Sequence, residues 1–274
     1  MRSKYGILVL ILSILNVGFF MNLPKEEEIK DVKVDIKTCF GDRVIKSGVT
    51  LEDYLVGVLY AEENPTSKTS KEYLKAFVIF ARTYSLKRGK YKDLDTHLSI
   101  KSCSSDQNWC DYESGCYREQ TEVMFNECIN FSLNKNSKKP YYSAKTCANR
   151  VTTFPGTKNV SNKTFTVNNS RWPKGYKKSA KSTTITSKWK GKPNDKYVEF
   201  LKSIVKETEG LVLKDQNGNI LNVGYMVCNS NTSNNIMCMN KAKNLGNKGY
   251  TSLEIIKAFT KKYKDIKIED YRNI

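Results

Sequence analysis

Two helical patterns in direct succession, separated by Asn64-Pro65, constrain the fold of this chain more than any other feature. The first begins with Thr50–Asp53, which has the pattern of a capping box, and ends near Glu63 because an Asn-Pro pair stops a helix. The second is expected to follow Thr69-Ser70 and to end at Gly89. The apolar face of the first helix consists of Leu51, Tyr54, Leu55, Val58 and Leu59. Both helices therefore need other elements to cover them.

The other patterns along the chain add strands and further helices. A first strand is predicted near Val32–Ile36, and Leu211–Val227 has the apolar runs of a β-hairpin around an Asn217-Gly218 turn. Further helices are predicted at about Asp195–Glu207 and Ser252–Lys262. These patterns predict an α+β fold, and 274 residues are enough to bury a substantial core.

The N-terminus contains a stretch suited to a membrane. Tyr5–Leu23 is a run of 19 residues without a charge, and Arg2 and Lys4 precede it. A bilayer span needs about 20 apolar residues, and flanking cations stay in the cytoplasm. We therefore expect a single-pass anchor at the cell membrane with everything after Pro24 extracytoplasmic. The absence of a small-residue cleavage site before Lys25 favours an anchor over a signal peptide, which would make the protein secreted.

The charge of the chain is strongly positive, with 46 Lys and Arg against 28 Asp and Glu. Such an excess favours polyanionic partners: nucleic acid, an anionic membrane face or an anionic wall polymer. Export argues against nucleic acid and leaves the other two. The basic aromatic run Arg171–Lys178 suits contact with a wall polymer, and a solvated loop is its alternative.

The chain contains eight cysteines. An even count outside the cytoplasm suggests disulfides, although sequence does not give the connectivity, and free thiols or a metal remain alternatives. The shortest loops would join Cys228 to Cys238, or two of the three cysteines between residues 103 and 116. The eight cysteines are Cys39, Cys103, Cys110, Cys116, Cys128, Cys147, Cys228 and Cys238.

The second helix carries a recognisable motif. The sequence LKAFVIFARTY, Leu74–Tyr84, resembles the LKAQAVAARTY signature of the SpoIID/LytB family, the stage II sporulation protein D group. Upstream, LEDYLVGVLYAEENP (Leu51–Pro65) is similar to that family's LEEYLxGVVAAEMP, with one residue inserted before the proline. Glu207–Leu221 and GYTSLEIIKAF (Gly249–Phe259) resemble later family segments. The resemblance covers about residues 49–117 and 204–268.

This resemblance implies an activity and a set of site residues. Active members are lytic transglycosylases that cut peptidoglycan glycan strands, and the glutamate of their AAE motif is the catalytic acid/base. That position corresponds to Glu62, with Glu63 as the alternative. Lys75 and Arg82 would bind the carboxylates of muramic acid, or serve as a surface lysine and an ion-pair partner. Tyr84 would contact substrate, or pack in the core.

Helix geometry supports Glu62 independently of the family. Positions 51, 55, 58 and 62 share one stripe, so Glu62 continues the apolar face, whereas Glu63 falls on the flank and is expected to be solvated. A carboxyl at the edge of an apolar surface has a raised pKa, which suits a general acid near neutral pH. A hydrolytic glycosidase needs two carboxylates, but a lytic transglycosylase can work with one, because the sugar's own 6-hydroxyl is the nucleophile.

Other motifs of the family have changed in this chain. Its Tyr-His-Ser-Ser-Gly-Gly stretch is Tyr225–Ser230 here, without the histidine, and its GHGVGMSQYGA motif survives only as IMCMNKAKN. These losses favour two alternatives: a non-catalytic wall-binding protein that enhances a partner amidase, or a structural component of a surface complex. Some relatives hold zinc after the ARTY helix, and His97, Cys103, Cys110 and Cys116 follow it here. A disulfide among these cysteines is an equally good use of them, so we expect no cofactor.

The resemblance also divides the chain. Residues 1–24 form the anchor and 25–48 a stem with the first strand. The SpoIID-like core is expected in two parts, 49–133 and 196–274. A Lys-, Ser-, Thr- and Asn-rich insertion at 134–195 separates them. The expected partners are peptidoglycan glycan strands, the membrane through the N-terminal helix, and an amidase or another wall-remodelling protein.

Overall fold

The computed structural model describes residues 31–39, 42–63, 65–102, 107–113, 128, 160–168, 182–190, 192–228, 235–263 and 265–273. The predicted anchor at residues 1–24 lies outside these ranges. Among the helices that the described ranges contain, none is long and apolar enough to cross a bilayer. The described part contains both helices and strands, so the predicted α+β class is confirmed.

The first sheet has three strands. Its central strand β1 (Lys33–Lys37) pairs antiparallel with β2 (Val44–Thr50) and parallel with β3 (His97–Lys101). Alternate residues of β1, Val34 and Ile36, are fully buried, as expected for a strand with one face on a core. The strand predicted near Val32–Ile36 is therefore confirmed.

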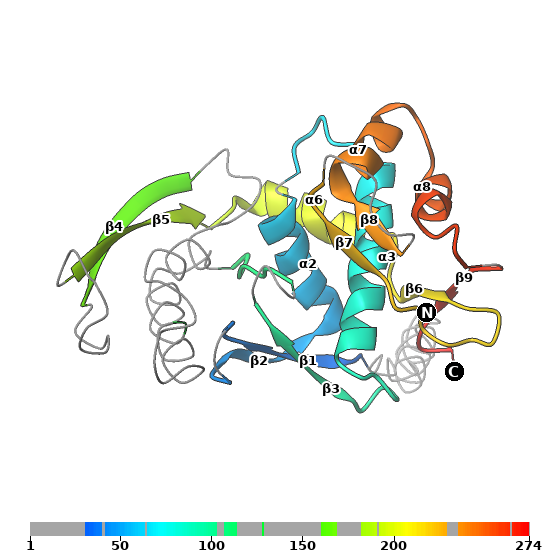
Figure 1. Ribbon diagram of the computed structural model, residues 1–274, viewed down its shortest axis with the longest axis horizontal. Helices are drawn as coiled ribbons and strands as arrows, with labels where there is room; N and C mark the ends of the chain where they lie inside the picture. The colour runs from blue at the N-terminus through cyan, green and yellow to red at the C-terminus, as the bar shows by residue number, and fades with distance from the viewer. Residues whose placement is uncertain are drawn as a thin grey trace, which may run out of the picture. The chain divides into compact units, whose positions relative to one another are not determined.

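Helices α2 (Leu51–Glu62) and α3 (Lys71–Arg88) lie side by side against this sheet (Figure 1). Each begins at a hydroxyl cap. The Thr50 side chain accepts the N–H of Asp53, and Ser70 accepts the N–H of Tyr73. Both helices were predicted within a residue or two of their observed bounds, because local caps and the Asn-Pro break determine them.

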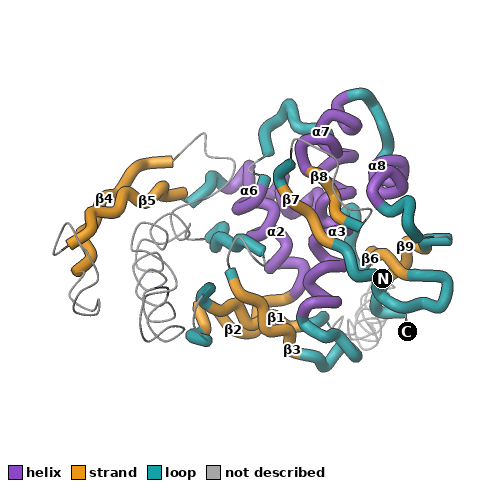
Figure 2. The backbone as a smooth tube through the Cα atoms, in the orientation of Figure 1, coloured by secondary structure: helices purple, strands orange, loops and turns teal. Residues whose placement is uncertain are grey.

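Three further helices surround α3. They are α6 (Asp195–Lys206), α7 (Met239–Asn247) and α8 (Ser252–Phe259), and each contacts α3 (Figure 2). Helix α6 was predicted, and α8 ends three residues before its predicted end. Helix α7 was not predicted. Because α3 is enclosed by helices and by the sheet, it is buried along most of its length.

The predicted hairpin at 211–227 is only partly correct. The turn forms, with Gly218 at a φ of +83°, but pairing across it stops at one bridge between Lys214 and Ile220. Strand β6 (Leu211–Lys214) pairs instead with the C-terminal β9 (Lys267–Asp270). The second arm leaves β6 after the turn, and its continuation β7 (Gly224–Met226) pairs parallel with β8 (Ile236–Cys238).

The predicted insertion at 134–195 contains one described pair of strands. Strand β4 (Val160–Asn168) is antiparallel to β5 (Ser182–Lys190), and the two form a sheet that includes no other described strand. The basic run Arg171–Lys178 lies between them, outside the described residues.

Candidate functional site

Two consecutive carboxylates end helix α2, and both are buried. Glu62 is the last helical residue and Glu63 is the C-cap, and each is 8% exposed. The C-terminus of a helix carries the negative end of its dipole, so carboxylates there are unfavourable unless other groups compensate them. No basic residue lies in the last turn of α2. Compensation therefore has to come from other elements.

Glu62 accepts a hydrogen bond from the main chain of a neighbouring segment. The amide N–H of Asn108 donates this hydrogen bond to Glu62 Oε1, with 2.8 Å between the nitrogen and the oxygen. The segment Gln107–Cys110 crosses α2 at Gly57, where the amide of Cys110 donates to the Gly57 carbonyl. A Cβ atom at Gly57 would collide with Trp109 and lie 2.7 Å from the Cys110 oxygen. Glycine is therefore required for the approach that brings the Asn108 amide to Glu62.

Gln107 anchors this segment from the other side. Its Oε1 accepts hydrogen bonds from the hydroxyls of Tyr54 at 2.9 Å and Ser85 at 2.6 Å. Its Nε2 donates to the Ala81 carbonyl at 3.2 Å and to the Tyr225 hydroxyl at 3.0 Å. One fully buried amide thus joins α2, α3 and β7. Nothing in the periodicity of the sequence pointed to Gln107 or Asn108; their place beside Cys110 was the available signal.

Glu63 is not the solvated end charge that the sequence predicted. Its Oε1 accepts a hydrogen bond from the Tyr73 hydroxyl, and the Lys243 ammonium lies 3.0 Å from its Oε2. The prediction was wrong because side chains from two other helices, Tyr73 of α3 and Lys243 of α7, bind the Glu63 carboxylate. Helical periodicity gives the face of Glu63, but not which elements pack there.

The two tyrosines next to these carboxylates remain protonated. Burial, followed by the charges of Glu63 and Glu62, raises the pKa of Tyr73. Burial, followed by the charge of Glu62, also raises the pKa of Tyr225. The Tyr225 ring packs edge-on against Phe77 with centroids 4.8 Å apart, which fixes the position of its hydroxyl. Both hydroxyls therefore remain neutral at neutral pH; that of Tyr73 donates to Glu63, and that of Tyr225 accepts from Gln107.

Arg82, a predicted substrate-binding residue, lies inside the protein. Its side chain is 0% exposed. Its guanidinium donates to both carboxylate oxygens of Glu52 and to the Leu211 carbonyl at 3.0 Å. This arrangement supports the ion-pair alternative that the sequence allowed.

Lys75 and Tyr84, the other two predicted substrate-binding residues, also contact side chains of the protein itself. Lys75 forms ion pairs with Glu72 at 3.0 Å and with Glu207 at 2.8 Å. Tyr84 is half-buried, and its ring lies edge-on to Tyr225 with centroids 6.4 Å apart. Direct substrate contact by Lys75, Arg82 or Tyr84 stays a prediction.

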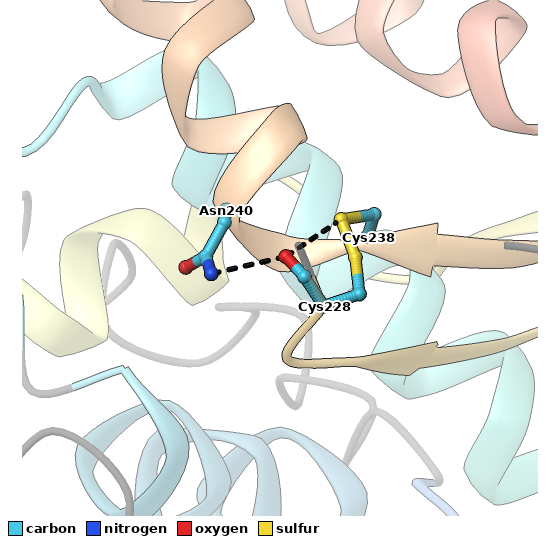
Figure 3. Close-up of a disulfide and its surroundings, with 3 residues drawn as sticks. All are labelled: Cys228, Cys238 and Asn240. Carbon is cyan, nitrogen blue, oxygen red and sulfur yellow. Dashed lines mark hydrogen bonds between the residues drawn. A yellow bond between two sulfur atoms is a disulfide. The ribbon is translucent and has the colours of Figure 1, made fainter. Parts of the chain in front are cut away.

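A disulfide joins Cys228 to Cys238, which is one of the short loops that the sequence left open (Figure 3). It links the residues after β7 to the N-cap of α7, and the Cys228 carbonyl accepts a 3.1 Å hydrogen bond from the side chain of Asn240. Cys110 and Cys128 are also disulfide-bonded. Their oxidation confirms the expectation of disulfides in this chain.

The residues considered for zinc are only partly described. Cys103 and Cys116 lie outside the described residues, and the sulfur of Cys110 is in a disulfide. His97 is exposed, with its Nδ1 atom 3.9 Å from the Asp35 carboxylate. Within the described part of the chain, no three His, Cys, Asp or Glu side chains are grouped as a metal site requires.

Part of the chain matches a known protein family. Residues 43–136 match the family model described as SpoIID, stage II sporulation protein. This span includes α2, α3, β3 and the Gln107–Cys110 segment, and hence both glutamates. No curated protein and no solved structure matches the chain.

Proposed function

We propose that this chain, whose residues 43–136 match the SpoIID family model, is a sporulation-related, cell-wall-associated protein that cleaves peptidoglycan glycan strands. The proposed reaction is that of a lytic transglycosylase acting on the bond between MurNAc and GlcNAc. Glu62 is the proposed general acid and base. The observation that carries the proposal is the buried Glu62 carboxylate, held by the Asn108 amide at the family's catalytic position.

One carboxyl group is sufficient for this reaction. Protonated Glu62 gives its proton to the glycosidic oxygen as the bond to C1 breaks, and the GlcNAc-bearing fragment leaves. The resulting carboxylate takes the proton of the MurNAc 6-hydroxyl, whose oxygen bonds to C1 and closes a 1,6-anhydro ring. Glu62 ends in its starting state and no water is consumed. A buried carboxyl such as Glu62 suits both proton transfers.

The contacts of Glu63 support transglycosylation over hydrolysis. A hydrolase would need the second carboxylate to activate water or to attack C1. Both oxygens of Glu63 already accept hydrogen bonds, one from the Tyr73 hydroxyl and the other from the Lys243 ammonium. Glu63 therefore suits a structural role beside a single catalytic Glu62.

The location we propose is the extracytoplasmic face of the cell membrane, where residues 1–24 anchor the protein. Disulfides persist in oxidising compartments, and the bonds at Cys228–Cys238, Cys110 and Cys128 support export. The net charge of +18 favours attraction to anionic wall polymers.

A non-catalytic role in the same setting is the second candidate, and specific contacts favour it. Glu62 is 8% exposed, and Arg82 and Lys75 both have internal carboxylate partners. A wall-binding protein that enhances a partner amidase requires no accessible acid. This candidate predicts glycan binding without any anhydro product.

Product analysis distinguishes the two candidates. The full-length protein in mild detergent is incubated with intact peptidoglycan and with glycan strands stripped of peptides, and 1,6-anhydro-muramyl products are measured by mass spectrometry. Glu62→Gln is the test variant. Glu199→Gln, on the exposed side of α6, is its matched control. Anhydro products from the wild type and the control alone support the transglycosylase; retained binding to the wall with no product from any protein supports the non-catalytic candidate.

A further inference from the structure

Glu63 is a buried carboxylate whose cation comes from a distant part of the chain. The Glu63 side chain is 5% exposed, whereas that of Lys243 is 39% exposed. Lys243 lies 180 residues further along the chain, and its side chain reaches Glu63 from α7, which packs against α3. Removing one partner of such a pair leaves the buried charge uncompensated, which is strongly unfavourable.

Helix α7 holds Lys243 in place through several contacts. A Cβ atom at Gly246 would lie 2.7 Å from the Ser70 hydroxyl and 2.8 Å from the Cβ of Tyr73, so α7 sits directly on the start of α3. The Lys243 ammonium also lies 5.7 Å from the centre of the Tyr73 ring, within cation–π range. Tyr73 and Lys243 thus form one unit around the Glu63 carboxylate.

Glu63 follows Glu62 directly, so a fixed Glu63 side chain restrains the turn that carries Glu62. We propose that the Glu63–Lys243 pair is a positioning device for Glu62, which keeps its carboxylate on the Asn108 amide. This inference rests on the proposed transglycosylase function and gives Lys243 a role that is not substrate contact. Lys243 compensates the charge of Glu63, and Tyr73 binds the other Glu63 oxygen.

The test compares Lys243→Met, Lys243→Arg, Glu63→Gln and the double variant Glu63→Gln/Lys243→Met. Displacement of a reacting group by roughly 1 Å can lower a rate about 100-fold. Lys243→Met is therefore expected to lower kcat for formation of the anhydro product by about 10- to 100-fold. Its KM should change less than about twofold, because Lys243 does not contact substrate in this proposal. Lys243→Arg keeps the charge and should retain most of kcat. The double variant should exceed Lys243→Met in kcat, because a neutral glutamine still accepts from Tyr73 and needs no cation.

A second readout does not depend on activity. Hydrogen exchange of the Asn108 amide, measured by NMR, reports its bond to Glu62. Exchange should be faster in Lys243→Met and return toward the wild-type rate in the double variant. Unchanged Asn108 exchange in Lys243→Met, or a double variant no better than that single variant, would overturn the proposal.

This readout separates the two possible failures. If the wild type makes no anhydro product, the proposed activity is wrong, and the Asn108 exchange rates alone still decide whether Lys243 positions Glu62. If the wild type is active but Lys243→Met matches it in both kcat and Asn108 exchange, only the positioning role is wrong. Should Lys243→Met fail to fold, the comparison of Glu63→Gln with the double variant remains: equal kcat is expected, and a further loss in the double variant contradicts the account.

Discussion

The carboxylate of Glu52 binds the guanidinium of Arg82 through two parallel hydrogen bonds, 2.8 Å from Nε to Oε1 and 2.5 Å from Nη2 to Oε2. This bidentate pair joins the first turn of α2 to the middle of α3. A third donor of Arg82 reaches the Leu211 carbonyl, which adds β6. Arg82 therefore holds together α2, α3 and β6.

Substitution of Arg82 should consequently act on stability. Arg82→Met removes one partner of a buried ion pair, and we expect a loss of about 3 kcal/mol in the free energy of unfolding. Urea denaturation followed by circular dichroism measures it. Lys71→Met, on the exposed first turn of the same helix, is the control and should stay within about 0.5 kcal/mol of the wild type. Wild-type stability combined with weakened glycan binding would instead assign Arg82 to the substrate.

The Gln107–Cys110 segment packs closely against α2 at Gly57, and a substitution of this glycine tests that packing. Gly57→Ala places a methyl group against Trp109 and the Cys110 carbonyl, and such overpacking costs about 1–3 kcal/mol. The displaced segment should also expose the Asn108 amide to faster hydrogen exchange. Gly224→Ala, where a Cβ would meet no atom within 4 Å, is the matched control. Equal stability of the two variants would contradict the close packing described for this segment.

The Cys228–Cys238 disulfide closes a short loop ahead of α7. Replacing both cysteines by serine restores entropy to the unfolded chain, and for a sequence separation of 10 the expected destabilisation is about 2–3 kcal/mol. Thermal unfolding of the double variant, compared with the wild type under non-reducing conditions, measures this loss. Because α7 carries Lys243, Asn108 exchange should rise in the same variant. An unchanged melting temperature would show that α7 keeps its place without the bond.

Acid should destabilise the fold through particular carboxylates. The Ser252 amide, followed by Lys75, lowers the pKa of Glu72 from its usual 4.5, and the Ser47 hydroxyl with the Gly48 amide lowers that of Asp35 from 3.8. A folded-state pKa below the unfolded value stabilises the protein above the unfolded pKa. That contribution is lost as the pH falls through the folded pKa.

We therefore expect the melting temperature to fall as the pH is lowered from about 5 to about 3. Glu72→Gln lacks one of these groups and should show a shallower fall over the same range. Glu199→Gln, whose carboxylate is exposed on α6, should follow the wild type. A wild-type slope in Glu72→Gln would mean that the Ser252 contact does not couple folding to pH.

Local signals explain what the sequence predicts well here. Helices α2 and α3 have hydroxyl caps and clear stops, so their bounds follow from a few neighbouring residues. Helix α7 has Cys238 as its N-cap, without a side-chain capping bond or an acidic first turn, and it was missed. Strand β6 was assigned to the adjacent arm because the turn at Gly218 is strong, whereas its partner β9 lies near the C-terminus.

In the candidate site, too, contacts within one segment could be predicted from the sequence, and contacts between distant segments could not. Glu62 could be proposed from a motif and a helical stripe, both read within one helix. The burial of Glu63 depends on Lys243, and the role of Gln107 depends on Tyr225, which lies 118 residues away. No pattern within a single segment encodes those contacts. They arise from the packing of α7 and β7 around α3.

The most direct test of Glu62 as the single acid/base is a digestion of glycan strands in water labelled with heavy oxygen, followed by mass spectrometry. The wild type and Glu199→Gln should give 1,6-anhydro products without label. Glu62→Gln should give at least about 100-fold less product, a loss typical of removing an essential proton-transfer group. Label at the newly formed reducing end, or equal product from Glu62→Gln, would contradict the role of Glu62 as the single acid/base.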